Sequence, residues 1–546
     1  MRAILDVAHE LGLRDDDLSL HGEHMGKLRH ATLRRLDTAE ARGNVILVTA
    51  LTPTKYGEGK TTMSIALAQG LARRGRRAVL SLRQPSMGPV FGAKGGGTGG
   101  GACTVEPSAQ INLHFTGDLH AIAAANNLLA ALTDHALHTG HPAAPDPRRV
   151  TWKRVLDMND RALRHVVLGL GGTGDGVPRE AAFEITAASE VMALLCLSTS
   201  IPDLKRRLGN LVVGFTTKNT PVTARDLHAV GPMAALLGSA LLPNLVQTAE
   251  GTPALVHGGP FANIAHGCSS VLATRTAARL ADHVITEAGF AFDLGGEKFF
   301  DIKCRSSGIW PRAVVLVVTV RALRHHGGDS ELKLTGAEAV RAVHAGMVNV
   351  ERHVAGIRRF GFSPVVAINV FNRDSEEELR AVEEACRERG LAVARCEGFA
   401  RGGAGAEALA EVVEEAVRRP AVSPSFLYPL EASPVEKLRA IATALYGATD
   451  VALSDDATRA LERLMAAGHG GLPVCVAKTP LSFSDDPDAG GNPGPFTLQV
   501  REIHLRAGAG FLLALTGDIQ TMPGLPRIPA AEGIDLTDDG EITGVH

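Results

Sequence analysis

Aromatic residues are scarce in this sequence. Phe, Trp and Tyr make up 4% of its 546 residues, and only two are tryptophan. Proteins that hold single-stranded nucleic acid stack bases on aromatic rings and follow the backbone with positive charge. This chain has few rings, and its formal net charge is −3. Composition therefore argues against nucleic acid or an anionic membrane surface as a partner.

Long apolar runs are also absent. No window approaches the roughly 18 uncharged apolar residues of a membrane span. The acidic, amphipathic stretch MRAILDVAHELGLRDDDL lacks the apolar core of a signal peptide. The seven cysteines are dispersed and include no CxxC pair, so reduced thiols are expected rather than a disulfide framework. We therefore expect a cytoplasmic protein with no membrane partner.

The most informative stretch is residues 44–62, NVILVTALTPTKYGEGKTT. Its apolar run at residues 45–48 is typical of a strand buried on both faces, and the Ala- and Leu-rich residues 63–74 predict a helix. Glycines in the turn between them let backbone N–H groups point inward, and Lys60 and Thr61 follow the turn. This layout predicts a nucleotide phosphate site. The lysine would reach a terminal phosphate, and the threonine would bind the Mg²⁺ that accompanies ATP.

The loop departs from the standard pattern G-x-x-x-x-G-K-[ST] at its first position, where Thr54 replaces glycine. An accidental turn is the alternative interpretation. The nucleotide-binding residues predicted by this stretch are Thr54, Lys55, Tyr56, Gly57, Glu58, Gly59, Lys60 and Thr61.

The rest of the chain alternates between two kinds of segment. After a helical lead-in at residues 1–43, short apolar runs alternate with segments of helical spacing as far as residue 320. Such alternation predicts a parallel sheet covered by helices on both faces, with ligands at the carboxyl ends of its strands. The predicted strands are residues 78–82, 166–170, 211–215, 254–257, 284–286 and 314–320, and the predicted helices between them include residues 179–197 and 269–281.

Two segments suggest domain boundaries, because a chain of this length is too long for one core. One is the Gly- and Asp-containing segment 326–330, and the other is the Pro-rich segment 420–434. The predicted fold class is α/β. Residues 1–330 would form a large P-loop NTPase-like domain with a parallel sheet, and residues 331–422 and 423–546 would form two smaller α/β domains.

A second glycine-rich loop follows the strand predicted at residues 78–82. It reads RQPSMGPVFGAKGGGTGGGACTVEP, with Arg83 at its start and Lys94 near its centre. A flexible linker is the alternative, but linkers are usually rich in Ser and Gly without Pro, Phe and Lys at their centre. Closely spaced glycines let backbone N–H groups approach oxyanions, which favours a second anion-binding loop. Arg83 could then orient a small carboxylate or an acyl phosphate, although a plain surface charge is the alternative.

Histidines raise the question of a metal site. NLHFTGDLH at residues 112–120 holds two histidines and Asp118, and VHGGPFANIAHGC holds His257, His266 and Cys268. Neither spacing fits a common zinc pattern. Pocket-lining residues are the favoured interpretation of the first stretch, and buried packing is the favoured interpretation of the second.

Several stretches taken together are specific. They include TPTKYGEGKTT (52–62), RQPSMGPVFGAKGG (83–96), INLHFTGDLHAI (111–122) and AGAGFLLALTGDIQTMPGLP (507–526). With others between them, they run through nearly the whole chain in one order. The sequence resembles the formate–tetrahydrofolate ligases, in which threonine is the usual first residue of the nucleotide loop.

The resemblance implies an ATP-dependent ligase that joins formate to N10 of tetrahydrofolate through formyl phosphate, with ADP and phosphate as the other products. It further implies Mg²⁺-ATP, activation by a monovalent cation (K⁺ or NH₄⁺), and a homotetramer of three-domain α/β subunits.

The resemblance also implies roles for single residues. Lys60 would stabilise the transferring phosphoryl group, Lys94 would join the nucleotide-binding residues, and Arg83 would hold formate and formyl phosphate. Asp118 matches an aspartate near the folate ring and would orient the pterin or handle a proton. The implied folate-binding walls are Phe290, Phe371 and Phe399.

Some positions depart from the family pattern. Phe399 stands where a tryptophan is usual, Ala102 where a tyrosine is usual, and Phe292 where a small residue is usual. Phenylalanine stacks with less contact area than tryptophan, so weaker folate binding is expected. Two alternatives therefore stay open: a ligase of the same mechanism with an altered acceptor, and a non-catalytic P-loop switch paralogue. Retention of Lys60 and Arg83 argues against a degenerate site.

Overall fold

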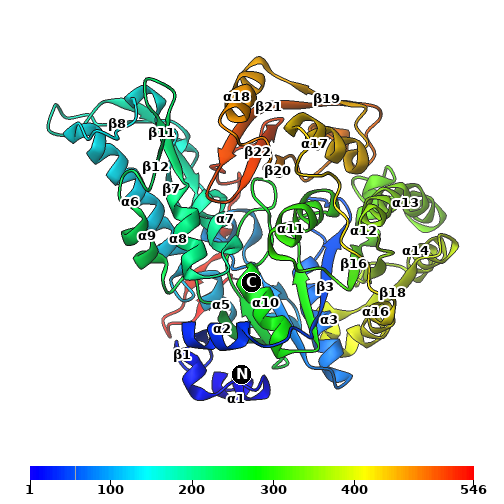
Figure 1. The fold of residues 1–546 in the computed structure, drawn as a ribbon. Coiled ribbons are helices and arrows are strands. Elements are labelled where there is room, and N and C mark those ends of the chain that lie inside the picture. Colours follow the sequence, from blue (N-terminus) through cyan, green and yellow to red (C-terminus); the bar gives the residue numbers. More distant parts are fainter. Residues whose placement is uncertain (56, 546) are drawn as a thin grey trace.

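The computed structural model describes residues 1–55 and 57–545. Within them, a twelve-stranded mixed sheet forms the centre of the molecule (Figure 1). One part of this sheet is parallel between every pair of neighbours. In spatial order its strands are β14 (Pro253–Val256), β4 (Ala78–Leu82), β15 (His283–Glu287), β3 (Asn44–Ala50), β16 (Ala313–Val318), β17 (Val365–Asn369) and β18 (Ala392–Cys396).

The other part of the sheet is antiparallel and extends it beyond β14. Two of its strands come from the N-terminal segment, which was predicted to be helical throughout. That segment instead folds as two helices with a hairpin between them, α1 (Ile4–Glu10) and α2 (His30–Asp37). The antiparallel strands are β1 (Leu18–Leu20), β2 (Gly26–Leu28), β13 (Asn244–Thr248), β6 (Cys103–Glu106) and β5 (Gly99–Gly100).

Helices cover both faces of the parallel part, as the alternation of segments predicts. Successive side chains of β3 point to opposite faces, so Val45 and Ile46 belong to different hydrophobic clusters. The cluster of Val45 includes side chains from α10 and α13, and that of Ile46 includes side chains from α3 and α16. These helices are α3 (Lys60–Arg73), α10 (Val271–Leu280), α13 (Gly336–Arg359) and α16 (Glu407–Arg418).

The sheet continues across the boundary predicted near residue 330. Val315 of β16 pairs in parallel register with Val365 of β17, which in turn pairs with Ala392 of β18. A parallel pair needs a crossover connection, and α12 (Val320–His326) with α13 supplies it. Strands from residues 1–330 and 331–422 therefore share one sheet, and the division of the chain into domains stays a prediction.

A second, four-stranded sheet lies in the C-terminal part of the chain, at the top of Figure 1. Its order is β19–β21–β22–β20, with β21 and β22 antiparallel and the outer pairs parallel. These strands are β19 (Asp450–Leu453), β20 (Val474–Ala477), β21 (Thr497–Arg506) and β22 (Phe511–Thr516), with α17 (Pro434–Ile441) and α18 (Asp455–Ala466) beside them.

Two predicted strands lie outside the main sheet. Residues 166–170 supply β8 (Val166–Leu168), which pairs only with β9 (Arg179–Ala181), and residues 211–215 supply β11 (Val212–Phe215), which pairs with β12 (Pro221–Thr223). The central parallel strands of the main sheet are buried on both faces, whereas β8 is partly exposed along its length.

The prediction of a helix at residues 179–197 was wrong for the first half of that range. That half forms β9 and β10 (Phe183–Ile185), and α7 begins only at Glu190 (Glu190–Leu197). Ser189 caps this helix, since its Oγ accepts a hydrogen bond from Met192 N over 3.1 Å.

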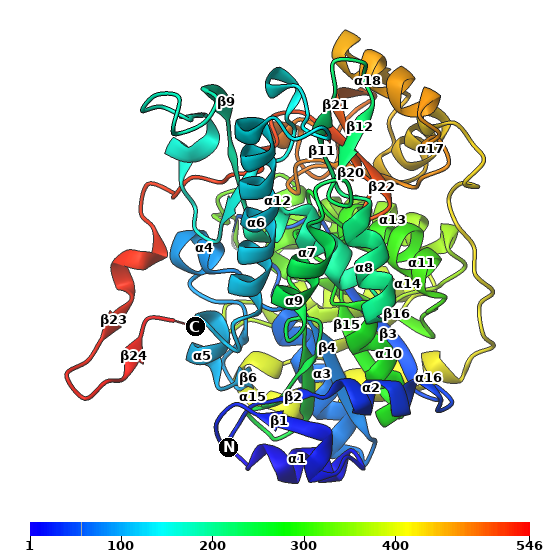
Figure 2. The ribbon, with the colours of Figure 1, turned by 60° about the vertical axis from the view of Figure 1, so that its left-hand side comes forward.

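A separate group of helices packs beside the sheet (Figure 2). The long helix α6 (Asp118–Thr139) shares a hydrophobic cluster with α7, α8 (Ile201–Gly209) and α9 (Val230–Leu237). In the described residues no helix combines the length and apolar character needed to cross a membrane.

Candidate active site

Most of the predicted site residues lie in loops after the parallel strands. The carboxyl ends of such strands meet at one edge of the sheet, where ligands bind. β3 is followed by residues 51–59, which we call the nucleotide loop, β4 by Arg83, and β15 by Phe290. β17 is followed by Phe371 and β18 by Phe399. The fold therefore brings residues from distant parts of the sequence to one edge.

The nucleotide loop depends on its glycines. Gly57 and Gly59 have φ angles of 71° and 69°, in the left-handed region that side chains disfavour. At residue 59 a Cβ atom would also lie 2.6 Å from Asn369 Nδ2. Helix α3 begins directly after this glycine, at Lys60, so its first N–H groups are available to an anion. Tyr56, a predicted nucleotide-binding residue, lies outside the described residues.

The structure gives a physical role to threonine at the first position of the loop. Glu58 Oε1 accepts hydrogen bonds from Thr54 N over 2.8 Å and from Thr54 Oγ1 over 3.0 Å. Its other oxygen accepts from Thr319 Oγ1, after β16. Glu58 is buried, so these bonds are needed to offset the loss of water around its carboxylate. A glycine at position 54 could supply only one of the two bonds.

Positively charged side chains gather around one carboxylate at this edge. Thr61 Oγ1 donates to Glu287 Oε2 over 2.9 Å, and Arg83 Nη2 lies 3.4 Å from Glu287 Oε1. Arg83 Nη1 also donates to the carbonyl oxygen of Pro260 over 3.3 Å. Lys60 is the next residue before Thr61, and it shares this environment.

The charged groups around Lys60 influence its pKa. Removal from water lowers this pKa to about 8, and the positive charges of Arg83 and Lys94 act in the same direction. The carboxylates of Glu287 and Glu58 oppose the lowering. Lys60, Arg83 and Lys94, which were predicted from two separate loops, therefore act on one another electrostatically. Such a cluster can bind a polyphosphate together with a second small anion.

Asp118 belongs to a different buried cluster. Its Oδ1 accepts from Lys27 Nζ over 2.7 Å, and its Oδ2 accepts from Asn244 Nδ2 over 2.8 Å. The aspartate is 2% exposed. Both carboxylate oxygens are thus paired within the protein, and among residues 1–55 and 57–545 the hydrogen bonds of Asp118 do not include the Lys60 cluster. Its predicted catalytic role stays a prediction.

The histidines that raised the zinc question are buried. His257 Nδ1 lies 2.6 Å from Ser270 Oγ and its Nε2 lies 2.7 Å from the oxygen of Ala240, and burial lowers the pKa of His257 to about 4. Burial lowers the pKa of His266 to about 3. Across residues 1–55 and 57–545, no group of three or more His, Cys, Asp or Glu side chains is arranged to hold a metal ion.

Phe371, and the glycine that precedes Phe290, lie close to charged groups of the site. Phe290 has a φ angle of 58°, which is unusual for a bulky residue. It follows Gly289, where a Cβ atom would lie 2.8 Å from Arg83 Nη1. The guanidinium of Arg321 lies 4.4 Å from the ring centre of Phe371, and Arg321 Nη2 donates to the carbonyl oxygen of Gly57. Arg321 therefore connects the nucleotide loop to Phe371.

Two departures from the family pattern are in direct contact with each other. The carbonyl oxygen of Phe399, on α15 (Gly398–Arg401), accepts from Ala102 N over 2.9 Å. A Cβ atom at Gly100 would lie 3.2 Å from the Phe399 ring. The phenylalanine is nevertheless 52% exposed, so much of its ring is open to a ligand.

The third departure, Phe292, does not line the ligand side of the sheet. It is 1% exposed and packs edge to face with Phe300 and Phe360, at centroid distances of 6.1 Å and 5.9 Å. It begins the π-helix η6 (Phe292–Gly296), and a Cβ atom at Gly356 of α13 would lie 3.3 Å from its ring. Of the three departures, Phe292 therefore does not belong to a ligand-facing loop, because its side chain fills the hydrophobic core.

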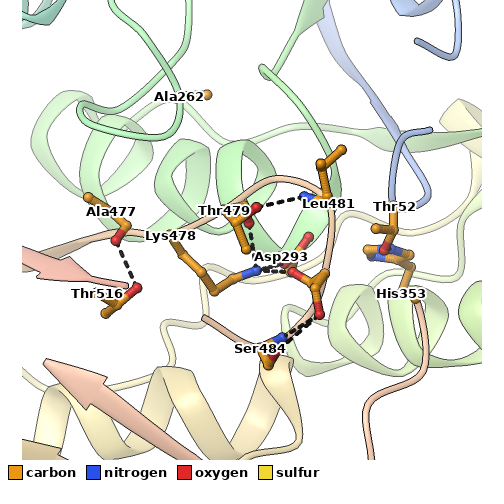
Figure 3. Close-up of polar contacts among 12 residues, drawn as sticks. Thr52, Ala262, Asp293, His353, Ala477, Lys478, Thr479, Leu481, Ser484 and Thr516 are labelled. Carbon is orange, nitrogen blue, oxygen red and sulfur yellow. Dashed lines mark hydrogen bonds and ion pairs between the residues drawn. The ribbon is translucent and has the colours of Figure 1, made fainter. Parts of the chain in front are cut away.

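A buried polar cluster that was not among the predicted site residues lies behind the nucleotide loop (Figure 3). Thr52 Oγ1 lies 3.1 Å from His353 Nε2, and Lys478 Nζ lies 3.1 Å from Asp293 Oδ2 and from the carbonyl oxygen of Thr479. His353 comes from α13, while Lys478 follows β20 of the second sheet. One signal was available: Asn349 and His353 are polar residues four apart on the otherwise apolar face of α13.

Glu287 was likewise not among the predicted site residues. The sequence feature that could have indicated Glu287 is an acidic residue at the end of the buried run HVITE. A carboxylate in such a position needs a partner, but the pattern alone does not identify one.

Comparison with known proteins decides the family. The family model described as formate–tetrahydrofolate ligase matches residues 1–546. The chain belongs to the formate–tetrahydrofolate ligase family. The resemblance predicted from the motifs and the α/β fold class are thereby confirmed.

Individual relatives support the assignment to the formate–tetrahydrofolate ligase family. The formate–tetrahydrofolate ligase of Myxococcus xanthus is 54% identical over 548 residues, which cover 100% of this chain and 99% of that protein. Those of Symbiobacterium thermophilum and a Methylobacterium species are 52% and 50% identical, and each match covers 100% of this chain and 98% of the relative.

Proposed function

We propose that this chain joins formate to N10 of tetrahydrofolate at the expense of ATP, giving 10-formyltetrahydrofolate, ADP and phosphate. The full-length family match and the names of the relatives support this reaction. The structural observation that carries the proposal is the convergence of Lys60, Thr61 and Arg83 around Glu287. A nucleotide phosphate group and a small carboxylate could meet there.

ATP would bind through the nucleotide loop and the first turn of α3. Backbone N–H groups at this helix terminus favour phosphate oxygens, and Lys60 would contact the γ-phosphate. The Thr61 hydroxyl is an oxygen donor of the kind that Mg²⁺ prefers, and it would contact the ion bound to the phosphates. When bound, Mg²⁺ would withdraw charge from the phosphate oxygens. Lys94 would add positive charge from the second glycine-rich loop.

Formate would bind to Arg83, whose planar guanidinium suits a carboxylate. A formate oxygen would attack the γ-phosphorus, and the bond from that phosphorus to ADP would break to leave formyl phosphate. N10 of the folate would then attack the formyl carbon, phosphate would leave, and the N10 proton would be released. Lys60 and Arg83 would stabilise the negative charge that develops in both steps.

The folate ring would lie against phenylalanine side chains. Phe371 and Phe399 would stack on the pterin, and Phe290 would form a wall near Arg83. Enclosure by these rings would also limit the access of water to formyl phosphate, which hydrolyses readily. Because Phe399 offers a smaller ring than tryptophan, we expect modest folate affinity.

Further features rest on the family resemblance alone. They are activation by K⁺ or NH₄⁺, assembly as a homotetramer, and proton handling or pterin orientation by Asp118. A cytoplasmic location is also proposed, and it rests on the composition of the sequence. Each is part of the proposal and can be tested separately from the reaction.

One assay tests the proposed function. Purified protein is given ATP, Mg²⁺, K⁺, formate and tetrahydrofolate, and the formation of ADP and formylated folate is followed. Equal amounts of both products are expected, and none without formate. ATP turnover independent of folate would favour a P-loop switch, whereas ATP binding without formyl transfer would indicate a changed acceptor. Either result would contradict the proposal.

A further inference from the structure

Glu287 occupies the centre of the candidate site. Glu287 is the last residue of β15, and β15 lies between β3 and β4 in the sheet. β3 leads into the nucleotide loop and β4 leads into Arg83, so a side chain at the end of β15 reaches both. Glu287 is 4% exposed, and its two oxygens point to different partners.

The direction of one hydrogen bond is informative. A threonine hydroxyl has one proton and two lone pairs. Thr61 Oγ1 donates its proton to Glu287 Oε2 over 2.9 Å. The lone pairs of Thr61 Oγ1 are therefore left for a cation. A cation at that point would also experience the negative charge of Glu287.

The other oxygen faces an arginine that the protein pairs incompletely. Arg83 Nη2 lies 3.4 Å from Glu287 Oε1, which is long for a hydrogen bond between charged groups. Arg83 Nε is buried and has no hydrogen-bond partner in the described residues. Arg83 as a whole is partly buried, and a purely structural ion pair of such an arginine is normally shorter, with its buried N–H groups satisfied. An arginine that also binds a small anion needs N–H groups that are not fully paired within the protein. The pairing of Arg83 is incomplete in this way.

The geometry points to Glu287 as the carboxylate of the Mg²⁺ site, acting through Thr61 and holding Arg83 with its second oxygen. The inference rests on the proposed function, since the ion would arrive with ATP. In phosphoryl-transfer proteins with a P-loop, the Ser or Thr after the lysine and an acidic side chain together hold the ion. Mg²⁺ commonly uses one or two carboxylates with phosphate oxygens and water. Glu287 is thus a positioning residue that couples the metal to the residue proposed to bind formate.

The surroundings of Glu287 agree with this role. The positive charges that face it come from three elements: Lys60 on α3, Arg83 after β4, and Lys94 on the π-helix η2 (Val90–Lys94). Glu58 is the other carboxylate that acts on Lys60, but both of its oxygens are bonded to threonines of the scaffold. Glu287 is therefore the carboxylate in a position to respond to the ion.

The test measures metal binding directly. Mn²⁺ replaces Mg²⁺, and its affinity for the protein–ATP complex is determined by electron paramagnetic resonance without formate, so that no formyl phosphate forms. Glu287→Gln keeps the shape but removes the charge, and it should weaken Mn²⁺ binding at least tenfold. Glu287→Asp keeps the charge with a shorter reach and should bind Mn²⁺ more tightly than Glu287→Gln. Glu190→Gln, at a buried carboxylate on α7, is the matched control and should leave Mn²⁺ affinity unchanged.

Turnover adds a second measurement. Loss of the contact with Arg83 should raise the KM for formate in Glu287→Gln more than the KM for tetrahydrofolate. Unchanged Mn²⁺ affinity in folded Glu287→Gln, or equal weakening in the Glu190→Gln control, would overturn the inference. Failure of the unaltered protein to bind Mn²⁺-ATP would instead contradict the proposed function, so the two failures are distinguishable.

Discussion

Asn349 holds Thr52 at the root of the nucleotide loop through two hydrogen bonds. Its Oδ1 accepts from Thr52 N over 3.2 Å, and its Nδ2 donates to Thr52 Oγ1 over 3.0 Å. His326 Nε2 lies 2.8 Å from the carbonyl oxygen of Thr52. The position of the loop is thus set by side chains of α12 and α13. The same Asn349 Nδ2 donates to the oxygen of Gly491 over 2.8 Å, which connects the C-terminal part of the chain to the loop.

The first prediction concerns Asn349→Ala. This change leaves the buried N–H of Thr52 without its partner, at a cost of about 1–3 kcal/mol. We expect the KM for ATP to rise about tenfold and the KM values for formate and tetrahydrofolate to change little, as steady-state kinetics would show. His344→Ala, on the exposed face of the same helix, is the control. An equal rise in all three KM values would mean that Asn349 acts only on general stability.

The second prediction concerns Arg83→Ala. Because Arg83 makes only two long hydrogen bonds within the described residues, its removal should leave the fold intact. Formyl transfer should fall by about 10²–10³-fold or more, since charge stabilisation at the reacting groups is lost. ATP binding, measured by calorimetry, should persist. Loss of ATP affinity in this variant would contradict the assignment of Arg83 to formate.

The third prediction concerns Phe399→Trp. Phe399 is 52% exposed, and a larger ring has room on its open side. A tryptophan should gain about 0.5–1.5 kcal/mol of stacking, which corresponds to a roughly 2- to 10-fold lower Kd for tetrahydrofolate. Fluorescence titration would measure the change, with Phe292→Leu, in the buried core, as a control for general repacking. An unchanged Kd would count against stacking at this position.

The fourth prediction concerns pH and Glu190. Burial raises the pKa of Glu190 from 4.5 to about 7, an effect to which Glu184 adds and which Arg506 and the backbone N–H groups of Gly508 and Ala509 oppose. Between pH 4.5 and about 7 the folded protein keeps a proton that the unfolded chain has lost, so stability falls as pH rises. Glutamine does not titrate. The Tm of Glu190→Gln minus that of the unaltered protein should therefore increase through this window and stay level above it.

The size of that effect follows from the shift. Each pKa unit corresponds to about 1.4 kcal/mol, so the difference in unfolding free energy between the ends of the window is on the order of 2–4 kcal/mol. Thermal unfolding of Glu190→Gln and of the unaltered protein is measured in the same series of buffers. The contributions of all other titrating groups then cancel in the difference between the two Tm values. A difference in Tm that does not depend on pH would contradict the prediction.

The sequence by itself determined the local units and the family. The buried run of β3, the glycines of the nucleotide loop and the start of α3 follow from neighbouring residues, because strand burial, left-handed φ angles and helix initiation are local properties. The motifs likewise identified the family, which the full-length match confirms.

Only the tertiary structure decided how these units meet. Glu287 contacts Thr61 and Arg83 across 226 and 204 residues of sequence, and it does so because β15 lies between β3 and β4. Strand order in a sheet depends on the packing of whole crossover units, which no local pattern encodes. The same reason explains Phe292. Its sequence context shows only a bulky residue where a small one is usual, whereas the π-helix after β15 directs its ring into the core against α13.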